Sequence, residues 1–277
     1  MDETQPQTQN DREGRRIDPI VFTYGPTKEA ILAYARAHGL MEYLSRYGFA
    51  HSPEDYVAVS RSLPVYAVAD GVTLDYAELA RRGMHYPDPS PAGDVAKIFC
   101  EKIIRQAEIR YDTFDETALL TLFKAANSEV SIYNRQRGLS GISGNPTGLY
   151  AATGSYVVLK ENKAFWAAIA DAYVAHFNRD MEMKFMSSGS CEPYAVINGQ
   201  EKMAERVESG VLETEAGDTV FLFSDGYEHY IRDPAFIKLF AQRNAALKND
   251  ILEYSRRMNA VDPEKFGHER SLIALPI

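Results

Sequence analysis

Helix-forming and strand-forming segments occur in separate blocks along this chain of 277 residues. The spacing of apolar residues predicts the order helix, strands, helices, strands, helix, strand, over residues 26–48, 54–71, 94–136, 155–224, 234–258 and 271–277. The first helical block is expected to be broken near His38-Gly39, and Asp94 is expected to cap the first central helix. A doubly wound parallel sheet would need strands and helices in alternation, so these blocks favour an α+β sandwich.

Composition limits the class of protein further. Hydrophobic residues make up 45% of the chain, which supports a packed core and excludes a disordered protein. A net charge of −9 argues against nucleic-acid binding, because a polyanion would be repelled. No apolar run approaches the roughly 20 residues that cross a bilayer, so no membrane partner is expected. Cys100 and Cys191 stand alone, which excludes a disulfide framework and a thiolate zinc site.

The first 17 residues are polar and are expected to form a flexible tail, followed by a single domain over residues 18–277. The beginning of the sequence has no apolar stretch of the kind found in a secretory signal. Together with the two isolated cysteines, this predicts a cytoplasmic protein.

An Asp-Gly pair follows a strand-like segment at two places in the chain, and these two pairs are the most informative about chemistry. The segments VYAVADG and VFLFSDG each place an Asp-Gly pair directly after a buried-looking strand, at Asp70-Gly71 and Asp225-Gly226. Taken alone, either pair favours a tight turn, because Asp-Gly is a common hairpin dipeptide. However, no obvious partner strand resumes after either glycine. A further acidic pair, Glu54-Asp55, begins the strand before Asp70, so a short hairpin would bring these carboxylates close together.

Carboxylates at neighbouring strand ends repel one another, and burial would raise the pKa of each unless cations compensate. Hard divalent ions with oxygen ligands are the natural compensation, and a glycine carbonyl can join them because no side chain blocks its approach. This ligand chemistry favours Mg²⁺ or Mn²⁺ over zinc. Two such ions can activate a water molecule and hold a phosphate oxygen, so the pattern points to phosphate chemistry.

Five segments in order now resemble a known family: PEDYVAV, VYAVADG, AIADAYV, VFLFSDG and HERSLIAL. Their order and spacing, from about Asp18 to the end, are similar to those of the metal-dependent serine/threonine protein phosphatases of the PPM type, which are protein phosphatase 2C-like. The resemblance implies a four-layer α-β-β-α sandwich, in which helices flank two antiparallel sheets. It also implies a centre of two or three Mn²⁺ or Mg²⁺ ions at one end.

The roles of the family's residues can be transferred where the motifs match. By resemblance, Asp70 would bridge two metal ions and the Gly71 carbonyl would complete one ligand shell. Glu54 would bind the second ion, and Asp55 would act through water. The metal-activated water would then attack phosphorus in line.

Two further aspartates are assigned in the same way. Asp225 would bind the first ion, and together with Asp70 it would carry the catalytic chemistry. Asp171 matches the acidic residue of the family's accessory third-metal site.

This sequence departs from the family pattern in several places. Val72-Thr73-Leu74 replaces a His-Gly-Gly run after the first Asp-Gly. In the last motif, His268 and Glu269 occupy the positions of an aspartate and of an Asn or Asp. His268 could ligate Mn²⁺, or Glu269 could reach the metal instead. No arginine lies beside Glu54 to bind phosphate, which leaves Arg46 as the candidate, with an ordinary surface role as its alternative.

The leading hypothesis is an enzyme that hydrolyses phosphoserine or phosphothreonine in a phosphorylated protein substrate. The alternative is a phosphatase-like domain with impaired catalysis that acts in binding or regulation, suggested by His268 and the missing glycines. Hydrolysis of a small phosphorylated metabolite by the same centre is a third possibility.

Overall fold

The structure is a computed structural model that describes residues 18–48, 51–190, 196–241 and 245–277. The expected tail over residues 1–17 and Cys191 lie outside the described residues. No helix in the part of the chain that the structure describes combines the length and the apolar composition that a bilayer crossing requires.

Two five-stranded antiparallel sheets form the centre of the molecule. The first sheet has the strand order β1 (Ile20–Tyr24), β10 (Arg270–Pro276), β9 (Thr219–Phe223), β6 (Tyr173–Phe177) and β7 (Met183–Met186). The second has the order β2 (Asp55–Val59), β3 (Val65–Gly71), β4 (Ala152–Lys160), β5 (Lys163–Ile169) and β8 (Glu208–Glu213). The expectation of an antiparallel sandwich is therefore confirmed.

The inner faces of the two sheets share one apolar core. Alternate residues of β3, β4 and β5 contribute to it from the second sheet, for example Val68 and Trp166. Leu222 of β9 and Ile273 of β10 contribute from the first sheet. All four side chains are buried, as the period-two alternation of strands requires when one face is covered.

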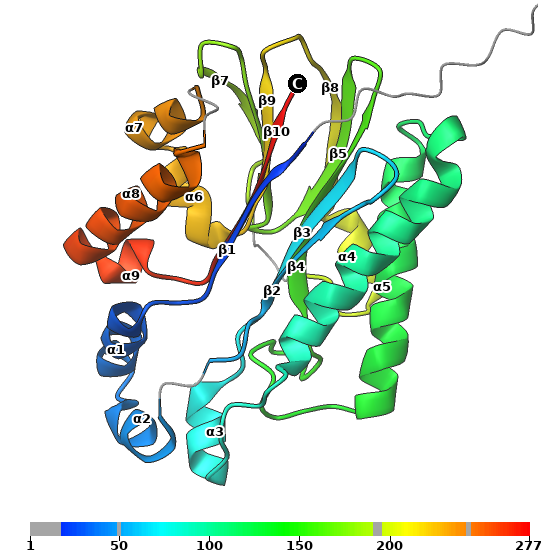
Figure 1. Ribbon diagram of the computed structural model, residues 1–277. Coiled ribbons are helices and arrows are strands. Elements are labelled where there is room, and N and C mark those ends of the chain that lie inside the picture. Colours follow the sequence, from blue (N-terminus) through cyan, green and yellow to red (C-terminus); the bar gives the residue numbers. More distant parts are fainter. Residues whose placement is uncertain (1–17, 49–50, 191–195, 242–244) are drawn as a thin grey trace, which may run out of the picture.

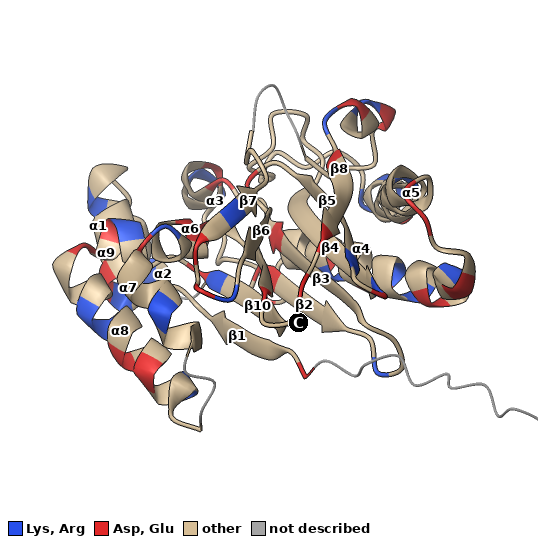
Figure 2. Ribbon diagram, turned by 90° about the horizontal axis from the view of Figure 1, so that it is seen from above, with Lys and Arg blue, Asp and Glu red and all other residues tan. Residues whose placement is uncertain are grey.

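Helices cover the outer face of each sheet (Figure 1). The long helices α4 (Pro91–Arg110) and α5 (Ala118–Arg137) pack on the second sheet. The first sheet is covered by α6 (Glu228–Ile231), α7 (Pro234–Ile237), α8 (Leu247–Val261) and α9 (Pro263–Phe266). Charged residues lie mainly on these helices, whereas the strands between them are uncharged for most of their length (Figure 2). These layers make the four-layer α-β-β-α sandwich that the resemblance implied.

Three short helices lie at one end of the sandwich (Figure 1). They are α1 (Lys28–Ala37), α2 (Met41–Tyr47) and α3 (Tyr76–Arg82). The break between α1 and α2 falls at His38-Gly39 as expected, where Gly39 adopts a φ of 68°. Such a left-handed conformation is easily reached by glycine and ends a helix. Four single-turn 3₁₀ helices complete the described elements, at Tyr111–Thr113, Glu201–Glu205, Asp225–Tyr227 and Lys238–Ala241.

One local expectation was wrong, and one strand was not expected. The side chain of Ser90, rather than Asp94, caps α4 by accepting the backbone N–H of Ala92, because Pro91 starts the helix one turn earlier than expected. The strand β1 was not expected, although it pairs with β10 along its whole length. The first sheet therefore begins before the first helical block.

Neither Asp-Gly pair forms a two-residue hairpin turn. Asp70 and Gly71 end β3 and pair with Thr153 and Ala152 of β4. Asp225 and Gly226 instead open a 3₁₀ turn that follows β9. The tight-turn interpretation is therefore wrong for Asp70-Gly71, whereas Asp225-Gly226 do form a turn, although not one that joins two paired strands.

Candidate metal centre

Acidic residues from five separate segments converge at one end of the sandwich. Asp55 begins β2 and lies directly opposite Asp70, which is near the end of β3. Asp225 follows β9, Glu269 precedes β10, and Asp171 lies between β5 and β6. We call Asp55, Asp70, Asp171, Asp225 and Glu269 the carboxylate cluster. Strand pairing within each sheet and packing between the sheets bring these residues together from distant parts of the chain.

Asp55 is buried and tied to the first sheet. Ser224 Oγ donates a hydrogen bond of 2.8 Å to Asp55 Oδ2 and accepts one of 2.9 Å from the Ser271 N–H. The other carboxylate oxygen, Oδ1, is buried without a hydrogen-bond partner. Burial, and next the charge of Glu269, raise the pKa of Asp55 to about 8. A buried oxygen without a partner costs free energy, and a cation bound to Asp55 Oδ1 would remove that cost.

Asp70 occupies the middle of the carboxylate cluster. Burial raises its pKa well above the ordinary value, and Asp55, Asp225 and Asp171 raise it further through their negative charges. Asp225 lies at the solvent-exposed rim, yet removal from water and the charge of Asp171 raise its pKa to about 6. These neighbouring carboxylates oppose one another's ionisation, so the cluster favours either bound protons or bound cations.

Glu54 lies beside the cluster and is held by its own partners. Tyr86 Oη donates a hydrogen bond of 2.7 Å to Glu54 Oε1, and Ser90 Oγ donates a second to the same oxygen. Burial raises the pKa of Glu54 to about 7, and hydrogen bonds from Ser90, Tyr86 and Thr73 oppose that rise. The other oxygen, Oε2, lies 3.5 Å from His51 Nε2 and has no hydrogen-bond partner. Burial lowers the pKa of His51 to about 4, which keeps its ring neutral at pH 7.

The two unusual residues of the last motif have different surroundings. Glu269 accepts hydrogen bonds of 3.1 Å and 3.3 Å from the backbone N–H groups of Glu54 and Asp55, so it ties the start of β10 to the start of β2. His268 is exposed near Asp225, and its ring hydrogen-bonds to the backbone carbonyl of Glu264. The structure thus brings both residues to the site, with Nε2 of His268 and both carboxylate oxygens of Glu269 in hydrogen bonds to the backbone.

Gly71 allows the end of β3 to approach α4 closely. A Cβ atom at this position would lie 2.6 Å from the carbonyl carbon of Ala92 and 2.7 Å from its oxygen. The Gly71 N–H donates to the Glu54 carbonyl at 3.0 Å. A larger residue would therefore push Asp70 and Glu54 away from their present positions.

The donor chemistry of the cluster fits a hard divalent cation. The available groups are carboxylate oxygens and a glycine carbonyl, and the buried oxygens Asp55 Oδ1 and Glu54 Oε2 have no hydrogen-bond partner. Within the described ranges, no group of three or more histidine, cysteine or acidic side chains is placed so that it could hold a metal ion as it stands. Glu54 and Glu269 are turned toward their hydrogen-bond donors, so cation binding would require some of these side chains to rotate.

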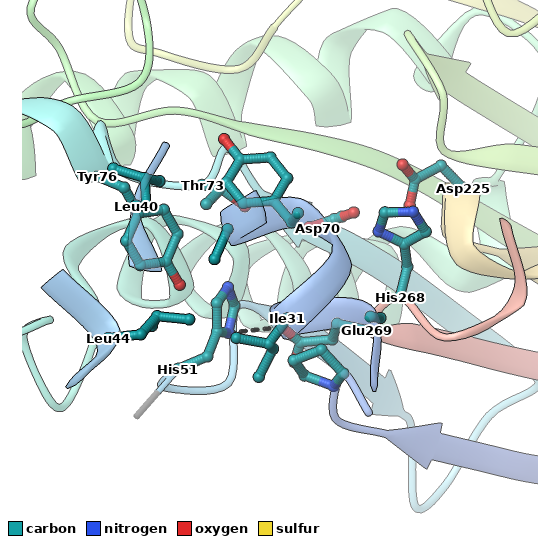
Figure 3. A pocket seen from close by; sticks show the side chains of 14 residues that line it. Ile31, Leu40, Leu44, His51, Asp70, Thr73, Tyr76, Asp225, His268 and Glu269 are labelled. Atoms are coloured by element: carbon teal, nitrogen blue, oxygen red, sulfur yellow. Dashed lines mark ion pairs between the residues drawn. The ribbon is translucent and has the colours of Figure 1, made fainter. Parts of the chain in front are cut away.

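A pocket of about 260 Å³ opens directly beside the cluster (Figure 3). Asp70, Asp225, His268 and Glu269 line one part of it. Arg46, the candidate phosphate-binding residue, does not line the pocket; it is exposed on α2, with its guanidinium 5.4 Å from the ring centroid of Tyr47. The structure therefore brings the acidic candidates together and leaves Arg46 outside.

Several residues that support the site were not found from the sequence. Tyr86 and Ser90 orient Glu54, Ser224 orients Asp55, and His51 lies between Glu54 and Glu269. Ser224 precedes Asp225 in a segment that was singled out, so its position was a usable signal. Tyr86 and Ser90 lie in a proline-rich loop, and nothing in the sequence relates that loop to Glu54.

Comparison with known families identifies the family of this chain. The model of a family described as protein phosphatase 2C matches residues 52–261, which is most of the chain. The chain belongs to the protein phosphatase 2C family. No curated protein sequence matches it.

Several solved structures share the fold at low sequence identity. One is the serine/threonine phosphatase Stp1 from Staphylococcus aureus, with a TM-score of 0.57 and 12% identity over 95% of this chain and 96% of that one. The catalytic domain of PstP in complex with two manganese ions has a TM-score of 0.55 and 13% identity, over 94% and 96%. RsbX in complex with magnesium has a TM-score of 0.51 and 10% identity, over 95% and 96%.

Proposed function

We propose that this member of the protein phosphatase 2C family hydrolyses phosphoserine or phosphothreonine in proteins and depends on Mn²⁺ or Mg²⁺. The convergence of the carboxylate cluster on a pocket, with buried carboxylate oxygens left without hydrogen-bond partners, carries this proposal. The manganese in PstP and the magnesium in RsbX support the choice of cation. Two or three ions would compensate the charge that raises the pKa values of Asp55, Asp70 and Asp225.

Different residues of the cluster would act as ligands to different ions. Asp70, which lies between Asp55 and Asp225, would contact two ions, and the Gly71 carbonyl and Glu54 would contribute to one of them. Asp171 would hold an accessory ion. The bound ions would polarise water and offset negative charge on the phosphoryl oxygens. The pocket would orient the phosphate ester next to Asp70 and Asp225, and the hydrogen bonds to Glu54 and Asp55 would keep these carboxylates in place.

Hydrolysis of a phosphothreonine peptide tests this function. With Mn²⁺ we expect a rate that a chelator abolishes, and a loss of at least about 100-fold in Asp70→Asn, because one ligand would be lost to two ions. Asp112→Asn is the matched control, since Asp112 is exposed on the distant 3₁₀ turn after α4. A rate that is indifferent to chelation, or full activity in Asp70→Asn, would contradict the proposal.

One observation favours a second candidate, a regulatory or binding domain with impaired catalysis. The ring of His268 is engaged by a backbone carbonyl and Glu269 by two backbone N–H groups, so the last motif supplies no free carboxylate. Binding of a phosphothreonine peptide without hydrolysis, in the presence of saturating Mn²⁺, would support this candidate against the enzyme.

A further inference from the structure

The pocket beside the carboxylate cluster has two chemically different halves. Acidic and imidazole groups line one half, and Figure 3 shows Asp70, Asp225 and His268 there. The other half is lined by apolar and aromatic side chains, which we call the apolar half: Ile31, Tyr34, Leu40, Leu44 and Tyr76. None of the described residues that line the pocket is lysine or arginine. The described part of the pocket therefore has no lysine or arginine that could bind a phosphate. It does have an apolar surface for a group next to that phosphate.

The apolar half is firmly built. Leu40 and Leu44 are 9% and 5% exposed and belong to the core under α1 and α2. The ring of Tyr76 packs against Tyr86 at 5.0 Å and against Tyr34 at 5.9 Å between centroids. Packing on several sides restricts Leu40, Leu44 and Tyr76, so this part of the surface is largely formed before any ligand arrives.

The apolar half is also fixed relative to the acidic half. At the start of α1, the Thr27 N–H donates a hydrogen bond of 2.8 Å to the carbonyl of Gly267, the residue before His268. The Thr27 hydroxyl donates to Asn259 Oδ1 at 2.8 Å, and α1 packs against α9. A ligand that spans the pocket would therefore meet both halves at a defined separation.

We propose that the apolar half binds a large apolar side chain next to the phosphorylated residue of the substrate. The proposal rests on the proposed function and names the class of phosphoprotein that it would favour. At about 260 Å³, the pocket lies below the roughly 300–1,000 Å³ typical of sites for whole small ligands. It suits one apolar side chain beside a phosphoryl group. An acidic neighbour would be disfavoured, because the apolar half would remove its hydration and supplies no lysine or arginine to replace it.

Three phosphothreonine peptides test this proposal, with both neighbours of the phosphothreonine as Leu, Ala or Asp. With Mn²⁺, we expect kcat/KM of the Leu peptide to exceed that of the Ala peptide by about tenfold or more, with the Asp peptide slowest. Phosphonate analogues of the Leu and Ala peptides, which cannot be hydrolysed, should show the same order in binding measured by fluorescence anisotropy.

A pair of matched variants locates the effect. Ile31→Ala removes three carbon atoms that a leucine side chain would contact in the apolar half. The ratio of kcat/KM between the Leu and Ala peptides should therefore fall to about twofold, since even one methylene in an apolar pocket changes kcat/KM by roughly tenfold or more. Ile132→Ala removes the same atoms from a side chain that is 43% exposed on α5 and should leave the ratio unchanged. Thermal unfolding of both variants checks that they are folded.

The outcomes separate this proposal from the proposed function. Equal rates for all three peptides would overturn the apolar preference and leave the phosphatase standing. Absence of hydrolysis with any peptide would overturn the phosphatase, and the phosphonate binding order would then decide the preference alone. A phosphotyrosine peptide with Ala neighbours that outpaces the Leu peptide would show that the apolar half receives the ester group itself, which also overturns the proposal.

Discussion

At the scale of single residues, His268 is the clearest departure of this site from a set of oxygen ligands. It lies near Asp225, where a carboxylate would complete the acidic half of the pocket, and its ring bonds to the Glu264 carbonyl instead. An imidazole adds no negative charge and suits Mn²⁺ better than Mg²⁺. The proposed centre should therefore work better with Mn²⁺ than with Mg²⁺.

Replacement of His268 by Asp tests this consequence. The new carboxylate supplies a hard oxygen ligand, so we expect Mg²⁺-supported hydrolysis to rise by about tenfold and the Mg²⁺ concentration for half-maximal rate to fall. His229→Asp, which places the same change on the exposed face of α6, is the control and should have no effect. An unchanged response of His268→Asp to Mg²⁺ would place residue 268 outside the ligand shell.

The sequence predicted which acids come together but not which residues hold them in place. Asp55, Asp70 and Asp225 were recognisable because each adjoins a buried strand. The partners Tyr86 and Ser90 could not be recognised, since they reach Glu54 only through the fold, from 32 and 36 residues away. Ser224 binds only one oxygen of Asp55, which leaves the other without a partner. This contact joins residues 169 positions apart, and the periodicity of the sequence does not reveal it.

At the scale of secondary-structure elements, the contact between the end of β3 and the start of α4 positions the site. Gly71 permits that contact because a Cβ would lie 2.6 Å from the Ala92 carbonyl carbon. The same helix start carries Ser90, which binds Glu54. The strand end and the helix cap therefore act as one unit that sets the positions of Asp70 and Glu54.

Gly71→Ala should disturb this unit. Overpacking against backbone atoms should lower the free energy of unfolding by about 1–3 kcal/mol and should also weaken Mn²⁺ activation, because Asp70 is adjacent. Gly25→Ala is the control: its Cβ would meet no atom within 4 Å, so urea denaturation should show little change. Equal unfolding midpoints for the two variants would contradict the close approach of β3 and α4.

Long elements were predictable because their periodicity extends over many residues. Most of α4 and α5 falls within the predicted segment 94–136, although α4 begins three residues before it, and the hairpin of β2 and β3 lies within residues 54–71. The edge strand β1 was missed because five residues carry little pattern and its pairing with β10 joins the two ends of the domain. Asp94 was mistaken for a cap because Pro91 can begin a helix and places Ser90 before it.

At the scale of the whole molecule, the crowded carboxylates should link stability to pH and to divalent cations. The pKa values of Asp55, Glu54 and Asp225 are raised by burial to about 8, 7 and 6, above those of the unfolded chain. Between about pH 4 and pH 8 the folded state thus holds more protons at these groups than the unfolded state. Their contribution to stability is present below about pH 4 and is lost as the pH rises to about 8.

Bound cations would replace those protons, so the stabilisation by Mn²⁺ should grow with pH. We expect the rise in Tm between chelator and saturating Mn²⁺ to be larger at pH 8 than at pH 5 by at least about 3 °C. Comparison at each pH cancels the titration of groups away from the site. Asp70→Asn should reduce the rise in Tm that Mn²⁺ produces at pH 8. A cation effect that is equal at both pH values would show that Mn²⁺ binds elsewhere.

The central claim is that carboxylates from distant segments jointly hold divalent cations at the end of the sandwich. Titration of the metal-free protein with Mn²⁺, followed by the electron paramagnetic resonance signal of the free ion, tests it most directly. We predict that at least two Mn²⁺ ions bind to each wild-type chain, with fewer bound to Asp70→Asn and an unchanged number to Asp112→Asn. If the wild-type protein leaves all Mn²⁺ free in solution, or if Asp70→Asn binds as many ions as the wild type, the claim is wrong.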